Sequence, residues 1–399
     1  MHSHVFMMKE RRDVAVEENK EREQLTERLT ILHLGDVFLD GPVQRLRRDT
    51  REHRREELRE AFRAFLTRVD EEKANLVIFS GNLLDGRYAG DETLRFLIDA
   101  FSSRPECHFV IAPGPLDPYD DKSIYRTKRF PNNVHIFFEE VLGCYNIPGM
   151  PLSVYGWSFR SENCTSAPLS GVHRTHNDRF TLLCGYTDGS AEKAPLDADA
   201  LAEFDAHYTA LSGKVHDGFH RAGNGIYSYS GSFEGRALDE VGVSVGGYIR
   251  ISAGKRSDGW DVEAVRVSLE TYSYVTARLD VSHLSTTEEV RPRLAAMIRE
   301  NGYGIKTVLR VILSGNVPIK AHFEDLDQGE FGVYSLKVVD HTVPTDTDGT
   351  LLKEMTARGE LYRHFYPQML EGTEAERALA ARAFRVGYAA LLGEEFSVY

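Results

Sequence analysis

The stretch TILHLGDVFLD, residues 30–40, decides the fold. Three of its first five residues, Ile31, Leu32 and Leu34, are apolar, which is typical of a buried strand. Gly35 and Asp36 then end the strand and begin a polar loop. Two similar strands follow, each after residues at helical spacing: Leu76–Phe79 and His108–Ala112. This βαβαβ order predicts a parallel, doubly wound sheet, in which functional residues gather at the carboxyl ends of the strands.

Short strand patterns become more frequent beyond residue 130 and predict a second sheet stacked on the first. They lie at residues 134–138, 153–157, 180–184, 226–230 and 247–251. From about residue 270 a strand, a helix (286–300), two strands (307–313 and 332–338) and further helices predict a small α+β domain. We therefore expect three parts: a charged N-terminal extension over 1–29, a main domain over 30–270 and a C-terminal domain over 271–399.

Composition and charge favour a globular protein and limit its partners. The 399 residues carry a formal charge of 48 − 61 = −13, so binding of nucleic acid would require a segregated basic face. The arginines of residues 45–55 are one candidate, but such a charge run is more typical of a solvated helix face. No apolar run approaches the ~20 residues of a membrane span, and the first residues lack a signal-peptide core. We expect a cytoplasmic protein without a membrane partner.

Each of the first three strands is followed by a loop that contains an acidic or amide side chain. These loops are GDVFLD (35–40), GNLLDG (81–86) and PGPLDPYD (113–120). Because parallel strands end at one edge of a sheet, the three loops should meet there. Carboxylates and amides at one edge indicate a site that is built to hold metal ions.

The order of motifs along the chain resembles that of the calcineurin-like metallophosphoesterases, and within them the DNA repair exonucleases of the SbcD and YhaO type. The motifs are Asp36, Gly81-Asn82, Pro113-Gly114-x-x-Asp117, LLCGY (182–186), GKVH (213–216) and GSFEGRALDE (231–240). The resemblance covers residues 30–395. It implies a four-layer α/β/β/α metallophosphoesterase sandwich with a small C-terminal α+β capping domain. It also implies two divalent ions, typically manganese, that activate water at a phosphodiester, and a coiled-coil ATPase partner of the SbcC type.

This chain departs from the family signature at most of the positions that hold metal or transfer protons. The signature reads DxH, GD, GNH(D/E), a lone His and GHxH, and of it the chain keeps Asp36, Asp117 and His216. The other positions hold Phe38, Asn82, Pro115, Leu116, Tyr186 and Lys214. Leu116 stands where the family has its catalytic His, so no catalytic residue is expected.

The side chains that remain are poor ligands for two divalent ions. Asp36, Asn82 and His216 carry one formal negative charge among them, and a pair of dications needs several anionic or imidazole ligands. We therefore expect no metal cofactor, and a pocket filled by apolar and aromatic side chains. The alternative is a reduced site in which the same three residues hold manganese or another divalent ion.

Two functions remain open at this stage. One is a non-catalytic binding or regulatory subunit in DNA repair or nucleic-acid metabolism, with an SbcC-like ATPase, DNA or a second copy of the chain as candidate partners. The other is an active phosphoesterase or nuclease with a reduced site. Lys214 is hypothesised to replace the missing metal charge by pairing with Asp36, the alternative being a lysine in solvent. His173, His176 and Asp178 could bind a metal, but a surface loop is the more typical origin of such a cluster.

Overall fold

The computed structural model describes residues 27–393 except 42–47, 173, 175–177, 215, 236–240 and 330, and leaves the side chains of 48–54 undescribed. Residues 1–26 of the predicted extension therefore lie outside the described part. Its last three residues open strand β1 (Glu27–Leu34). Contacts divide the chain into two units: residues 1–234 with 246–270, and residues 235–245 with 271–399.

The first sheet of the first unit has the strand order β13-β12-β1-β2-β3-β4. Four strands run parallel: β1, β2 (Leu76–Phe79), β3 (His108–Ile111) and β4 (Val134–Ile136). Two continue it antiparallel, β12 (Gly247–Arg256) and β13 (Gly259–Ser268). The register aligns Leu34 with Phe79 and Phe79 with Ile111, so the loops that follow β1, β2 and β3 start at one edge of the sheet.

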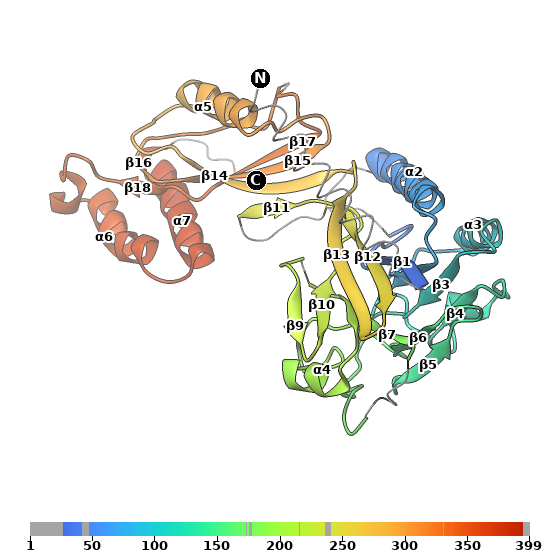
Figure 1. The fold of residues 1–399 in the computed structure, drawn as a ribbon. Helices are drawn as coiled ribbons and strands as arrows, with labels where there is room; N and C mark the ends of the chain where they lie inside the picture. The colour runs from blue at the N-terminus through green and yellow to red at the C-terminus, as the bar shows by residue number, and fades with distance from the viewer. Residues whose placement is uncertain are drawn as a thin grey trace, which may run out of the picture. The chain divides into compact units, whose positions relative to one another are not determined.

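The second sheet has the order β5-β6-β7-β8-β10-β9. Its four central strands are parallel: β6 (Leu152–Gly156), β7 (Phe180–Tyr186), β8 (Tyr208–Ser212) and β10 (Gly225–Tyr229). The edges are antiparallel: β5 (Gly143–Asn146) and β9 (His220–Ala222). Figure 1 shows both sheets in the lower part of the ribbon.

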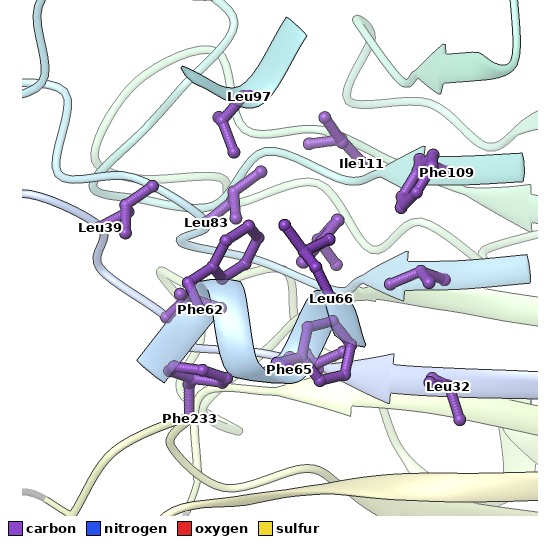
Figure 2. Packing of buried hydrophobic residues seen from close by; sticks show 14 of the residues in the cluster. Leu32, Leu39, Phe62, Phe65, Leu66, Leu83, Leu97, Phe109, Ile111 and Phe233 are labelled. Atoms are coloured by element: carbon purple, nitrogen blue, oxygen red, sulfur yellow. The ribbon is translucent and has the colours of Figure 1, made fainter. Parts of the chain in front are cut away.

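The two sheets are packed face to face with helices on both outer sides. Helices α2 (Arg48–Glu71) and α3 (Asp91–Ser102) cover the first sheet, α4 (Ala198–Phe204) covers the second, and the one-turn η1 (Ile124–Arg126) lies in the loop after β3. Figure 2 shows Phe62, Phe65 and Leu66 of α2 against the outer face of the first sheet. Residues from both sheets share the core between them. This is the α/β/β/α sandwich, so the predicted fold class is confirmed.

The alternation of side chains along a strand explains how the first sheet contributes to two hydrophobic cores. Successive side chains of a strand point to opposite faces. In β1, Leu29 and Ile31 face the second sheet, while Leu32 and Leu34 face the helices. A strand that is apolar on both faces is therefore required, and the sequence around residue 30 supplies it.

The second unit is an α+β arrangement. Its sheet has the order β11-β14-β15-β17, with bounds β11 (Gly242–Ser244), β14 (Ser273–Asp280), β15 (Thr307–Ser314) and β17 (Ser335–Asp340). Helix α5 (Thr287–Glu300) covers one face. The remaining elements are β16 (Asn316–Pro318), β18 (Val343–Thr345), η2 (Leu351–Lys353), α6 (Ala357–Leu370) and α7 (Glu374–Leu392). Residues 235–245, which the sequence placed in the first domain, group with this unit because β11 pairs with β14.

None of the helices in the described ranges combines the length and the apolar character that a membrane span requires.

A neutral histidine is buried between the two sheets. The His33 ring hydrogen-bonds through Nδ1 to the Tyr208 hydroxyl at 3.1 Å and through Nε2 to Ser80 Oγ at 3.0 Å. Burial lowers the pKa of His33 to about 3. Burial also lowers the pKa values of His135 and His207 to about 4, although both are partly exposed.

We expect acidification to destabilise the first unit through His33. Its folded pKa is about 3, against 6.5 for the free side chain, so between these pH values the unfolded state binds more protons. The free energy of unfolding should therefore fall by about 1.4 kcal/mol per pH unit from this group as the pH drops below 6.5. Urea unfolding at several pH values measures the slope. In the variant His33→Gln, the slope of the free energy of unfolding against pH should be smaller by the contribution of about one proton. An unchanged slope would contradict the assignment of this pH dependence to His33.

Candidate functional site

The loops after β1, β2 and β3 are joined by backbone hydrogen bonds at the edge of the first sheet. The Asp36 N–H donates to the Gly81 carbonyl at 3.0 Å, and the Phe38 N–H donates to the Asn82 carbonyl at 2.9 Å. The Gly86 N–H donates to Leu116 O at 2.8 Å and ties the second loop to the third. The three motifs therefore lie side by side, as their positions after parallel strands predict.

Four residues in these loops adopt the left-handed backbone conformation without being glycine. Their φ angles are 50° for Asp36, 52° for Phe38, 64° for Asp40 and 51° for Asn82. Such a conformation costs about 1–3 kcal/mol per residue and is concentrated in proteins at functional sites. Three of the four, Asp36, Phe38 and Asn82, stand where the resemblance implies metal ligands, and Asp and Asn tolerate this conformation better than Phe38 does.

Asn82 connects all three loops through its side chain. Its Nδ2 donates to Asp36 Oδ1 at 2.7 Å, and its Oδ1 accepts from the Leu116 N–H at 2.9 Å. The Gly213 N–H donates to the second oxygen, Asp36 Oδ2, at 3.2 Å. Asp36 and Asn82 are 8% and 2% exposed. A buried amide thus satisfies a buried carboxylate, which a carboxylate at position 82 could not do without a proton or a cation.

Asp117 is a second buried carboxylate and holds the loops together from below the surface. Oδ1 accepts from the backbone N–H of Gly114 at 2.7 Å and of Asn82 at 3.1 Å. Oδ2 accepts from the Leu84 N–H at 3.1 Å and from the Tyr125 hydroxyl at 2.6 Å. Burial raises the pKa of Asp117 to about 6 while the four donors oppose that rise, so the carboxylate is ionised at neutral pH. Its role is structural.

Apolar and aromatic side chains stand at the substituted positions. Pro115 is buried and Leu116, Phe38 and Tyr186 are half-buried. The Tyr186 ring packs edge-on against Phe159 with 5.5 Å between centroids. Burial, with the nearby Asp36 carboxylate, raises the pKa of Tyr186, so its phenol stays protonated. These groups offer packing, not metal coordination.

Lys214 does not form the hypothesised ion pair with Asp36. Its Nζ lies 5.1 Å from the centroid of the Tyr229 ring, in a cation–π arrangement, and within the described residues no salt bridge joins it to a carboxylate. The exposed ammonium gains more from the ring and from water than it would from entering a site where Gly213 N–H and Asn82 already hydrogen-bond Asp36. The predicted pairing is therefore wrong.

His216 has one ring nitrogen fixed by the backbone. Nδ1 lies 2.8 Å from the Tyr229 carbonyl, so Nδ1 carries the hydrogen and Nε2 keeps a lone pair. Burial and the neighbouring Arg266 lower the pKa of His216, which keeps the ring neutral at pH 7. His216, which is one of the positions retained from the family signature, therefore keeps one ring nitrogen, Nε2, that could coordinate a metal.

The residues present do not fit two divalent ions. In the ranges that the structure describes, no group of three or more His, Cys, Asp and Glu side chains is placed to hold a metal. Asp36 and Asn82 direct their oxygens at hydrogen-bond donors of the protein. The other predicted cluster lies mostly outside the described residues, which omit His173 and His176; the Asp178 carbonyl accepts from the Trp260 indole at 3.1 Å.

A set of close polar contacts between the two sheets, beneath the site, was not predicted from the sequence. Ser212 Oγ donates to the Ser80 carbonyl at 2.9 Å, and a Cβ on Gly35 would collide with Ser212. The signal was present in the sequence as a Ser-Gly pair at three strand ends: Ser80-Gly81, Ser212-Gly213 and Ser230-Gly231. Small residues at these points let the loops of both sheets approach each other.

A second network that the sequence did not reveal fixes α2 against the first loop. The buried Asp40 carboxylate accepts from Arg59 Nε at 3.0 Å and from its terminal nitrogen at 2.9 Å, and the Thr93 hydroxyl also donates to it. Asp40 and Arg59 are 19 residues apart, and no periodic pattern links them.

Comparison with known proteins agrees with this arrangement. Residues 29–187 match the family model of the calcineurin-like phosphoesterases. The chain contains a calcineurin-like phosphoesterase domain. The match includes the loops with Asp36, Asn82 and Asp117 and ends just beyond Tyr186. No curated protein matches the chain.

Several solved structures are similar to part of this chain at low identity. Vacuolar protein sorting 29 of Cryptosporidium parvum is 13% identical, with a TM-score of 0.29, over 60% of this chain and 98% of that one. Vps29 of Entamoeba histolytica complexed with Zn²⁺ is 12% identical, with a TM-score of 0.30, over 60% and 99%. A predicted phosphoesterase of Streptococcus pneumoniae is 9% identical, with a TM-score of 0.27, over 61% and 99%.

Proposed function

We propose that the phosphoesterase domain is non-catalytic and that the protein is a cytoplasmic binding or regulatory subunit in nucleic-acid metabolism, of the DNA repair exonuclease type. One observation carries the proposal: Asn82 Nδ2 donates to Asp36 at 2.7 Å where the signature requires a metal-bridging carboxylate. The Asn82 amide compensates the buried Asp36 carboxylate, as metal ions would in an active relative. Leu116, at the position of the catalytic His, offers no proton to a leaving group.

The charge balance supports the same conclusion. Two divalent ions bring about four positive charges, and metal hydrolases offset them with several anionic or imidazole ligands. Of the two carboxylates in the described site, Asp117 accepts four hydrogen bonds from the protein. The two oxygens of Asp36 accept hydrogen bonds from Asn82 and Gly213. Displacing those donors would leave buried polar groups without partners at about 1–3 kcal/mol each.

We expect the purified protein to retain much less than one manganese ion per chain. The test is exposure to excess manganese, desalting and elemental mass spectrometry, with cleavage assays on duplex and single-stranded DNA. Asp36→Ala is the matched variant, and DNA cleavage by the wild type should not exceed that of Asp36→Ala. Stoichiometric manganese together with cleavage that Asp36→Ala abolishes would instead establish an active enzyme with a reduced site.

The proposed partner is a coiled-coil ATPase of the SbcC type that docks on the C-terminal unit. Co-purification of the tagged chain from its native host, followed by mass spectrometry, tests this. An ATPase lost on deletion of residues 357–393, which hold α6 and α7, supports the subunit role. DNA as the sole retained partner, or a homodimer by light scattering with no ATPase, would contradict the ATPase assignment.

A further inference from the structure

A groove lies beside the substituted loop and is formed within the first unit. Its volume is about 380 Å³, and three loops line it: residues 86–87 after β2, residues 115–124 after β3 and residues 161–162 after β6. The Leu116 carbonyl accepts from Gly86 N–H at 2.8 Å and fixes the first loop against the second.

We call the apolar lining residues of the groove its wall and the acidic ones that are at least partly exposed its rim. Pro115, Leu116, Pro118 and Ile124 supply the wall. Asp120 and Glu162 add two carboxylates at the rim. Arg87 is the one cation among the described residues of the lining, and it is already paired, since its guanidinium donates to both oxygens of Asp85 at 3.0 and 2.9 Å. The groove thus has a surplus of negative charge on a chain of net charge −13.

An unsatisfied hydroxyl also lines the groove. Ser123 is 6% exposed, and among the described residues its Oγ has no hydrogen-bond partner. It precedes η1 as the N-cap residue but makes no side-chain capping bond. A buried hydroxyl without a partner costs about 1–3 kcal/mol, so a polar group of a ligand that reached Ser123 would gain a hydrogen bond there. One rotation about χ1 is enough to turn it between staggered positions.

We propose that this groove binds an extended peptide of a partner protein in which a Lys or Arg stands close to an aliphatic side chain. The aliphatic side chain packs on Leu116 and Pro118, and the cation lies between Asp120 and Glu162. A main-chain amide or carbonyl of the peptide completes the hydrogen bonding of Ser123. The inference deepens the proposed function, on which it rests, by giving the substituted Leu116 a binding role.

Charge complementarity selects a peptide over a nucleic acid at this groove. Phosphates would face Asp120 and Glu162 without a free cation in the lining, whereas a basic peptide is attracted to both. Rim charges act mainly through association rate and weaken with salt. The apolar wall should therefore set the affinity, and the carboxylates should set the preference for basic sequences.

The test is selection from an immobilised hexapeptide library by the full-length protein, with a selected peptide then labelled for affinity measurements. Glu162→Lys should weaken binding about 3- to 10-fold at low salt. The matched control is Glu263→Lys, an exposed β13 residue outside the groove, which should bind like the wild type. Leu116→Asp should abolish binding, and circular dichroism would show that it is folded.

Ser123→Ala separates a binding role from a structural one. Loss of an unsatisfied hydroxyl should leave the free energy of unfolding unchanged or raised, while peptide affinity falls about 2- to 10-fold. The proposal is overturned if no sequence is selected, if acidic peptides are selected, if Glu162→Lys binds as Glu263→Lys does, or if single-stranded DNA displaces the peptide. A failed selection leaves the manganese and cleavage results unaffected, so the two proposals fail separately.

Discussion

Replacing Asp117 with Asn should lower the free energy of unfolding by about 3–5 kcal/mol, since one buried carboxylate accepts four hydrogen bonds and the amide can accept only part of them. The Asn NH₂ group would face the N–H of Leu84 or Gly114, donor against donor. Urea unfolding monitored by tryptophan fluorescence and circular dichroism measures the change.

Tyr125→Phe provides the matched control for Asp117→Asn. It removes one donor, the hydroxyl at 2.6 Å from Oδ2, and leaves the three backbone donors in place. A loss of about 1–2 kcal/mol is expected. Equal losses in the two variants would show that the phenol alone stabilises the carboxylate, and would contradict the role of Asp117 in joining the loops.

The sandwich could be predicted because its determinants are local and repetitive. Short apolar runs such as Leu76–Phe79 are typical of strands that are buried on both faces. The apolar residues of 58–69 recur at helical spacing, which predicts that one face of α2 packs on the sheet. The parallel register then brings the loops with Asp36, Asn82 and Asp117 to one edge. Motif order along the chain was enough to locate the candidate site.

The parts that could not be predicted depend on contacts between distant residues or on long side chains. His33 meets Tyr208 across 175 residues, and no period marks that pair. The strands β5 and β9 are short and half-exposed, so they leave little apolar signal. Lys214 has several rotatable bonds, and its choice of the Tyr229 ring over Asp36 is decided by the surroundings of the carboxylate.

The opposite substitution, Asn82→Asp, tests directly whether an amide has replaced the metals. It removes the Nδ2 donor at 2.7 Å and puts a second carboxylate beside Asp36 in a site that is almost fully buried. Two such carboxylates cannot both ionise cheaply, so one pKa of the pair rises. In EDTA at pH 7 we expect the free energy of unfolding to fall by about 3–5 kcal/mol.

The pH dependence of this loss distinguishes like-charge repulsion from a simple loss of packing. Because the folded pKa of the new carboxyl is raised, its destabilisation is largest at high pH and disappears as the pH falls toward the pKa of the unfolded side chain. Asn82→Ala, the control, removes the Nδ2 donor without adding charge, and it also removes the acceptor of the Leu116 N–H. Its loss should be about 1–3 kcal/mol and should vary less with pH than the loss in Asn82→Asp, because only the pKa of Asp36 changes.

Manganese should distinguish Asn82→Asp from both the wild type and Asn82→Ala. A divalent ion that binds only the folded state of Asn82→Asp raises its free energy of unfolding with concentration, whereas the wild type and Asn82→Ala should not respond. Unfolding curves in EDTA and in millimolar manganese make the comparison. If Asn82→Asp is as stable as the wild type in EDTA, the hydrogen bond between Asn82 and Asp36 does not stabilise the protein. If the wild type itself gains stability from manganese, the site still binds metal, and the non-catalytic assignment fails with it.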